Sequence, residues 1–153
     1  MKNLVLATFA LVASVQISCA GLFNDLVGKW KVTNTRPGYS ITTVFKKVGS
    51  KGLKRTSTIV IPGLANAKDV TNYNADGTVN GTIKRGGVVQ VTLEGTWRVS
   101  GNTLIEDVEL TGVAYPGGAT QKTKVKKVNI NKLSTVSTIN GTRTTGTLAR
   151  VRP

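Results

Sequence analysis

After Gly28, most of the chain alternates between apolar and polar side chains with a period of two. Val, Ile and Thr dominate the alternating segments, and Gly, Asn and Pro separate them. Asp-Gly at 76–77 and Asn-Gly at 140–141 are strong signals for tight hairpin turns. Many short strands at a spacing of roughly 8–12 residues are typical of a sandwich or an antiparallel barrel, and tight up-and-down hairpins favour the barrel. The sequence therefore predicts an all-β domain, an antiparallel up-and-down β-barrel of about 8–10 strands with a short N-terminal helical turn at 22–27.

The same alternation predicts the strand bounds and the buried face. The expected strands are 29–34, 40–47, 53–61, 68–74, 78–84, 88–100 with a bend or bulge at Gly95, 103–111, 122–133, 134–139 and 142–152. The expected core side chains are Trp30, Val32, Phe45, Val79, Ile83, Val91, Trp97, Val99, Leu104 and Val108.

Residues 1–20 have the organisation of a secretory signal peptide. Lys2 supplies a positive charge, 4–15 is an almost unbroken apolar run, and small residues precede a cleavage site after Ala20. The run is too short to span a bilayer comfortably. We therefore expect one mature domain, 21–153, that is secreted or periplasmic and has no transmembrane segment. The less favoured alternative is a lipoprotein acylated at Cys19, because the residues before this cysteine lack the leucine usual in a lipobox.

The composition excludes several kinds of chemistry. The 153 residues include no His and a single Cys, which removes a histidine base, a histidine–serine or histidine–cysteine pair and imidazole metal ligands. The segment 72–77 resembles the start of a calcium loop, but its twelfth position is Ile83 rather than Glu, and a hairpin turn explains the same residues. We therefore expect neither enzymatic activity nor a metal or other cofactor.

The chain is strongly basic, with 21 Lys and Arg against 7 Asp and Glu and a formal net charge of +14. Lys122, Lys124 and Lys126 share one face of a strand and form a basic ladder. Such a face can contact an anionic polymer or an acidic lipid surface, or it can serve only to keep a strand soluble. Nucleic acid is not an expected partner, because the basic stretches lack the interleaved aromatic residues of single-strand binding platforms.

Three segments carry a family resemblance: Leu-Val-Gly-Lys-Trp-Lys-Val at 26–32, Tyr-Asn-Ala-Asp-Gly-Thr at 73–78, and Glu-Gly-Thr-Trp-Arg-Val-Ser-Gly-Asn-Thr-Leu at 94–104. Together and in this order they resemble the small bacterial lipocalin-like domains, a family of calycin-type β-barrels. Avidin-like barrels also begin with Gly-Lys-Trp, but their biotin site needs several tryptophans and this chain has two. The helix before the last strand and the disulfide of larger lipocalins are not expected here.

The resemblance implies a structural motif at the closed end of the barrel. Trp30 would lie inside that end, and a basic side chain from a late strand, Arg150 or Arg152, would lie across its ring in a cation–π contact. The residues assigned to this motif are Gly28, Trp30, Gly95, Trp97, Arg150 and Arg152.

The resemblance also implies a binding protein for a small, mostly apolar ligand. The alternation suggests Phe45, Tyr73 and Glu106 as inward side chains that contact it. An inward Glu106 could meet a polar ligand head or an inward Arg, but we favour an edge strand on which this carboxylate is solvated or salt-bridged. The alternative function is a basic, non-enzymatic interaction protein that adheres to anionic envelope or matrix components.

Overall fold

A computed structural model describes residues 21–152 of the chain. The expected signal peptide and Cys19 therefore lie outside the described residues. Within the described part, no helix is both long enough and apolar enough to cross a membrane.

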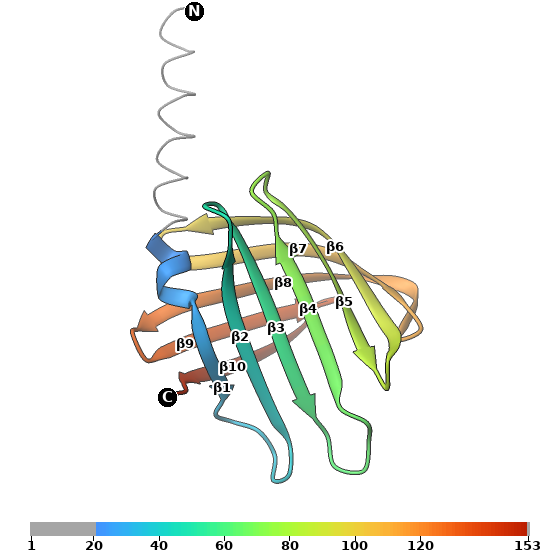
Figure 1. The fold of residues 1–153 in the computed structure, drawn as a ribbon. Coiled ribbons are helices and arrows are strands. Elements are labelled where there is room, and N and C mark those ends of the chain that lie inside the picture. Colours follow the sequence, from blue (N-terminus) through green and yellow to red (C-terminus); the bar gives the residue numbers. More distant parts are fainter. Residues whose placement is uncertain (1–20, 153) are drawn as a thin grey trace, which may run out of the picture.

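The described residues form a closed, all-antiparallel barrel that follows a short helix, Gly21–Leu26 (Figure 1). Each strand pairs with the next one along the chain, and the last strand pairs with the first to close the sheet. The expected up-and-down β-barrel with an N-terminal helical turn is confirmed. The strands are β1 (Gly28–Val32), β2 (Ser40–Val48), β3 (Gly52–Val60), β4 (Ala67–Tyr73), β5 (Thr78–Arg85), β6 (Val88–Ser100), β7 (Thr103–Gly112), β8 (Tyr115–Asn129), β9 (Lys132–Ile139) and β10 (Thr142–Arg150).

Two expected strand bounds differ from the observed ones by more than two residues, and both belong to β8. The strand expected over 122–133 ends at Asn129, and a turn at 130–131 leads into β9. There the backbone N–H of Asn131 donates to the Asn129 side chain at 2.9 Å, which forms an Asx turn. This turn was not predicted because the apolar Ile130 continues the strand-like pattern. β8 also begins at Tyr115, earlier than expected, and β6 is one continuous strand whose register does not shift at Gly95.

The core begins at the end of the barrel that the N-terminal helix covers and extends along β6, β7 and β8 toward the opposite end. Leu22, Phe23 and Leu26 of this helix are buried, and the Phe23 ring lies 5.2 Å from the Trp97 ring. Eight of the ten expected core residues are buried, and the other two, Val32 and Ile83, are partly buried against the core. The additional buried apolar residues within the core cluster are Leu22, Phe23, Leu26, Leu53, Tyr73, Leu93, Leu110, Ala119, Val125, Leu133 and Leu148.

Arg150 lies on β10, opposite Trp30 of β1, and connects these first and last strands of the barrel to the N-terminal helix. Its guanidinium carbon lies 4.2 Å from the centre of the Trp30 ring, and its nitrogens donate to the carbonyls of Asp25 at 2.6 Å and Val27 at 2.9 Å. These carbonyls are at the C-terminal end of the helix, where a cation is favourable. Gly28 has φ +131°, and a Cβ there would lie 2.6 Å from an Arg150 nitrogen, so glycine is required. Arg152 is exposed.

Candidate functional site

Phe45, Tyr73 and Glu106 face the lumen of the barrel, and a fourth residue, Arg55, connects them. Arg55 is the register partner of Phe45 on the neighbouring strand. It donates to the Tyr73 hydroxyl at 2.8 Å and to the Glu106 carboxylate at 3.3 and 3.4 Å. Tyr73 in turn donates to Glu106 at 2.6 Å. Arg55 is not among the residues that the sequence predicts for this site.

The Arg55–Glu106 ion pair crosses the lumen. Arg55 lies on β3 and Glu106 on β7, and β4, β5 and β6 separate these strands in the closed sheet. Two strands so far apart around a closed barrel face each other across its interior. The pair therefore forms a floor inside the barrel, with the helix and the aromatic side chains of Phe23, Trp30 and Trp97 on one side of it. On the other side, toward the end of the barrel opposite the helix, Val108 and Leu110 of β7 are still buried in the core.

Asp69 and Thr71 complete the polar cluster from β4. Asp69 accepts hydrogen bonds from Arg55 at 3.2 Å and from the Thr71 hydroxyl at 2.8 Å, and Thr71 also accepts one from Arg55 at 3.0 Å. Each polar group of the cluster therefore has a partner within it, as buried polar groups require. We call Arg55, Asp69, Thr71, Tyr73 and Glu106 the ionic floor.

Burial and charge act on the ionic floor in opposite directions. Burial alone would lower the pKa of the Arg55 guanidinium, but the charge of Glu106, with smaller contributions from Tyr73 and Asp69, raises the pKa above its ordinary value. Burial raises the pKa of the Tyr73 phenol, and Arg55 only partly opposes this. Tyr73 therefore stays protonated and remains a hydrogen-bond donor to Glu106.

The expectation of an edge position for Glu106 is wrong. β7 pairs with β6 on one side and β8 on the other, so it has no free edge, and the Glu106 side chain is only 2% exposed. The partner of this carboxylate is an inward arginine, Arg55. Phe45 and Tyr73 are equally buried. A direct contact of these three residues with a ligand stays a prediction, because each is packed within the barrel.

Solvent reaches the lumen from the end opposite the helix. The side chains of Arg55 and Asp69 are 14% and 10% exposed although they face inward, so this exposure comes from the interior. Ile59 and Ile139 share the inward face of their strands nearer to the open end, and Ile83 lies opposite Asp69. All three are also partly exposed. We call the lumen between the ionic floor and this open end the mouth of the barrel.

The polar side chains in the wall of the mouth are paired with one another. Thr43 and Ser57 share a hydrogen bond of 3.0 Å between β2 and β3. Thr123 and Ser137 do the same at 2.7 Å between β8 and β9, and Gln121 donates to Thr123 at 2.7 Å. Because these polar groups already form hydrogen bonds with one another, the surface left for a ligand consists of methyl groups and isoleucine side chains.

The outer face of the sheet carries the predicted basic ladder. Lys122, Lys124 and Lys126 are all exposed, on the face of β8 opposite the buried Thr123 and Val125. With Arg143, Val136 and Thr138, the first two lysines line a shallow groove of about 240 Å³. Lys122 also forms an ion pair of 3.2 Å with Asp107, which is half exposed.

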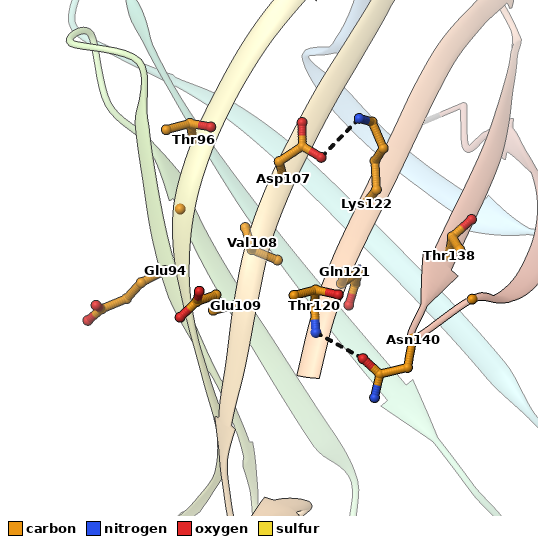
Figure 2. Close-up of a pocket in the computed structure, with 12 residues that line it drawn as sticks. Glu94, Thr96, Asp107, Val108, Glu109, Thr120, Gln121, Lys122, Thr138 and Asn140 are labelled. Carbon is orange, nitrogen blue, oxygen red and sulfur yellow. Dashed lines mark hydrogen bonds and ion pairs between the residues drawn. The ribbon is translucent and has the colours of Figure 1, made fainter. Parts of the chain in front are cut away.

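Next to the basic ladder, the outer face becomes acidic. Figure 2 shows a second shallow groove, of about 480 Å³, in which Asp107, Glu109 and Glu94 come from β7 and β6. Glu94 and Glu109 are direct register partners. Lys122 and its ion pair with Asp107 mark the boundary between the acidic and basic parts of this face (Figure 2).

The loop that resembles the start of a calcium site is a hairpin turn between β4 and β5. The Asp76 carboxylate accepts hydrogen bonds from the Thr78 backbone at 2.9 Å and from its hydroxyl at 2.6 Å, and these bonds lower the pKa of Asp76. The turn also receives the Trp97 indole, which donates to the Asn74 carbonyl at 2.8 Å. Trp97 thus fixes the hairpin to β6.

Comparison with known proteins shows the fold. No family model matches the chain, and no curated protein is significantly similar to it. Among solved structures, the chain is similar to Rv2717c from M. tuberculosis, at 15% identity and a TM-score of 0.53, over 88% of this chain and 98% of that chain. A redesigned β-barrel aligns over 88% of this chain and 97% of that chain, at 18% identity and a TM-score of 0.45. Membership of the lipocalin-like family stays a prediction.

Proposed function

We propose that this chain is a secreted or periplasmic, non-enzymatic binding protein that holds a small, mostly apolar molecule in the mouth of the barrel. The observation that supports this most directly is the partial exposure of inward side chains from Ile59, Ile83 and Ile139 down to Arg55 and Asp69. Inward apolar side chains that solvent can still reach gain free energy when an apolar ligand covers them.

The ionic floor supports an apolar rather than a polar ligand. Arg55, Asp69 and Glu106 already satisfy one another, so a ligand does not need to supply a charged group at this depth. The hydroxyl groups of the wall are likewise paired. Binding of an apolar ligand to these surfaces is favourable because it removes apolar surface from water, which contributes about 25 cal/mol for each Å² buried.

The export part of the proposal rests on residues 1–20. The charge at Lys2, the apolar run 4–15 and the small residues before Gly21 are the features that a signal peptidase recognises. Cleavage after Ala20 leaves a domain without cysteine, because Cys19 is removed.

We expect the exported protein to begin at Gly21 and to carry a small molecule. Native mass spectrometry of protein purified from its source measures both, since the intact mass gives the cleavage site and a co-purifying mass gives the ligand. For the emptied protein, the neutral fluorescent probe N-phenyl-1-naphthylamine should bind and be excluded by Ile59→Trp, which fills the mouth. We expect at least about tenfold weaker binding, because overlap with a packed side chain is costly.

Thr58→Trp is the matched control, because Thr58 is the exposed neighbour of Ile59 on the outer face of β3. It adds an indole to the same strand without entering the lumen, so probe binding should be unchanged. Equal probe affinity in both variants would place the probe outside the barrel and contradict the proposal.

A second candidate function rests on the basic outer face. Lys122, Lys124 and Arg143 surround one groove, and the mature chain carries a net charge of +13 once Lys2 is removed from the 21 basic residues, leaving 20 against 7 acids. This concentration of charge suits adhesion to an anionic polymer or lipid surface.

We expect retention on immobilised heparin to be strong at low salt and to collapse as salt rises. The Debye length falls from about 30 Å at 0.01 M to about 8 Å at 0.15 M ionic strength, which screens surface attraction. Reversal of Lys122, Lys124 and Lys126 to Glu should remove most of the retention. The same reversal of Lys46, Lys54 and Lys68 changes the net charge equally on other strands. If both triple variants elute alike, only net charge matters and the basic ladder is not a site.

A further inference from the structure

Arg85 is a second inward-facing arginine, at the rim of the mouth. It is the last residue of β5 and shares the inward face of this strand with Val79 and Ile83, whereas Lys84 is exposed. Its register partners are Ala67, which is buried, and Val88, which is exposed. The side chain is therefore partly buried. The end of β5 that carries it lies away from the N-terminal helix (Figure 1).

Arg85 differs from the other partly buried arginines, Arg55 and Arg150, in having no partner among residues 21–152. Its Nε is shielded from solvent and has no hydrogen-bond acceptor among the described residues, and Arg85 takes part in none of their ion pairs. Arg55, by contrast, is bonded to two carboxylates, and Arg150 to three backbone carbonyls. A buried donor without an acceptor is unfavourable and calls for an explanation, such as a ligand that satisfies it.

No acid of the barrel interior is available to Arg85. The acid nearest along the neighbouring strand is Asp69, which faces Ile83 and lies deeper in the lumen than Ala67. Both carboxylate oxygens of Asp69 are already used, one by Arg55 and the other by Thr71. The ionic floor holds two carboxylates and one guanidinium, a formal charge of −1, whereas the guanidinium of Arg85 at the rim has no carboxylate in direct contact.

We propose that Arg85 anchors the carboxylate of an amphipathic ligand whose apolar body extends from the rim toward the ionic floor. This inference rests on the proposed function, and it names the ligand class. A guanidinium presents paired N–H donors that match a carboxylate. A single unpaired arginine suits a single negative charge, whereas a doubly charged phosphate monoester would bring one charge that the rim does not neutralise.

The depth of the mouth sets the size of the apolar body. Arg85 lies four residues along β5 from Gly81, which is the register partner of Thr71 in the ionic floor. At about 3.4 Å per residue this is about 14 Å along the strand, or about 10 Å along the barrel axis after allowance for strand tilt. Asp69, which pairs with Ile83, lies about half as deep. A medium-length chain fills this depth, so decanoate is a suitable probe.

The test is competition against N-phenyl-1-naphthylamine by decanoate and by 1-decanol, which share their apolar chain and differ in charge. In the unmodified protein, decanoate should displace the probe at a concentration at least about tenfold lower than decanol, because it gains the charged hydrogen bonds to Arg85. In Arg85→Gln this preference should shrink to less than about threefold, while the affinity for decanol is retained. Lys84→Gln is the matched control, since it removes the same charge from the adjacent outward position, and it should keep the preference.

The outcomes separate this inference from the proposed function. If decanoate and decanol compete equally in the unmodified protein, or if Arg85→Gln keeps the full preference, the carboxylate anchor is refuted and the apolar binding function stands. If the probe does not bind at all, both the apolar binding function and the carboxylate anchor are refuted. Thermal melts of Arg85→Gln show whether it is folded, and the Nε–H signal of Arg85 in the unmodified protein should shift on addition of decanoate. An unchanged signal at saturating decanoate would also refute the anchor.

Discussion

Replacing Trp30 with Ala should lower the free energy of unfolding by about 3–5 kcal/mol, the range measured for truncation of buried tryptophans. Trp30 is fully buried, its indole N–H donates to the Leu26 carbonyl at 2.8 Å, and Arg150 lies over its ring. The substitution leaves a cavity and also removes the surface that holds the arginine over the helix end. Thermal or urea unfolding followed by circular dichroism measures the loss.

Lys31→Ala provides the control for Trp30→Ala. Lys31 is the next residue on β1 and its side chain is exposed, so its removal should change the free energy of unfolding by less than about 0.5 kcal/mol. Unfolding curves of Trp30→Ala that overlay those of the unmodified protein would show that Trp30 does not contribute to the core.

Replacing Glu106 with Leu should be as damaging, at about 3–5 kcal/mol, because it leaves the buried guanidinium of Arg55 with one carboxylate where it had two. Tyr73 also loses its acceptor. The double substitution Arg55→Met with Glu106→Leu removes both charges of the pair that crosses the lumen. It should therefore be less destabilised than the sum of the two single variants, a coupling that a double-mutant cycle in urea measures.

Asp107→Leu is the matched control for Glu106→Leu. Asp107 is the adjacent residue on β7, also forms an ion pair, and faces outward with its side chain and that of Lys122 about half exposed. Exposed pairs contribute about 0–1 kcal/mol, so this variant should stay near the stability of the unmodified protein. Similar losses for the two variants, or strictly additive single effects in the cycle, would show that the Arg55–Glu106 pair does not act as a unit.

The barrel could be predicted from the sequence because period-two alternation and hairpin turns are local signals. Trp30, Trp97 and Val79 show their burial by their place in that alternation. The β8–β9 boundary could not be placed correctly, because Ile130 continues the apolar pattern through the turn while its side chain is 58% exposed. Hydropathy alone does not distinguish an exposed apolar turn residue from a strand residue.

The ionic floor was harder to predict, because its main contact is not between strands that neighbour each other. Arg55 and Glu106 are 51 residues apart and meet across the lumen. Arg55 does alternate with Leu53 and Ser57, so its inward direction was available from parity, but the nearby lysines suggested a solvated basic cluster. No local pattern shows that Arg85 lacks an acceptor, since this depends on which acids the closed barrel has already used.

The Arg150 contact has a consequence for the order of events in folding. This side chain bonds to carbonyls 123 and 125 residues earlier in the chain, and β1 pairs with β10 through only a few residues around Trp30. The last strand must therefore be available before the sheet can close, and contacts of such sequence separation are typical of domains that fold in milliseconds to seconds. Until closure, β1 and β10 each present an unpaired edge that can pair with another chain. A shortened chain that lacks β10 would leave β1 and β9 unpaired permanently, so the C-terminal strand protects the protein from aggregation as well as stabilising it.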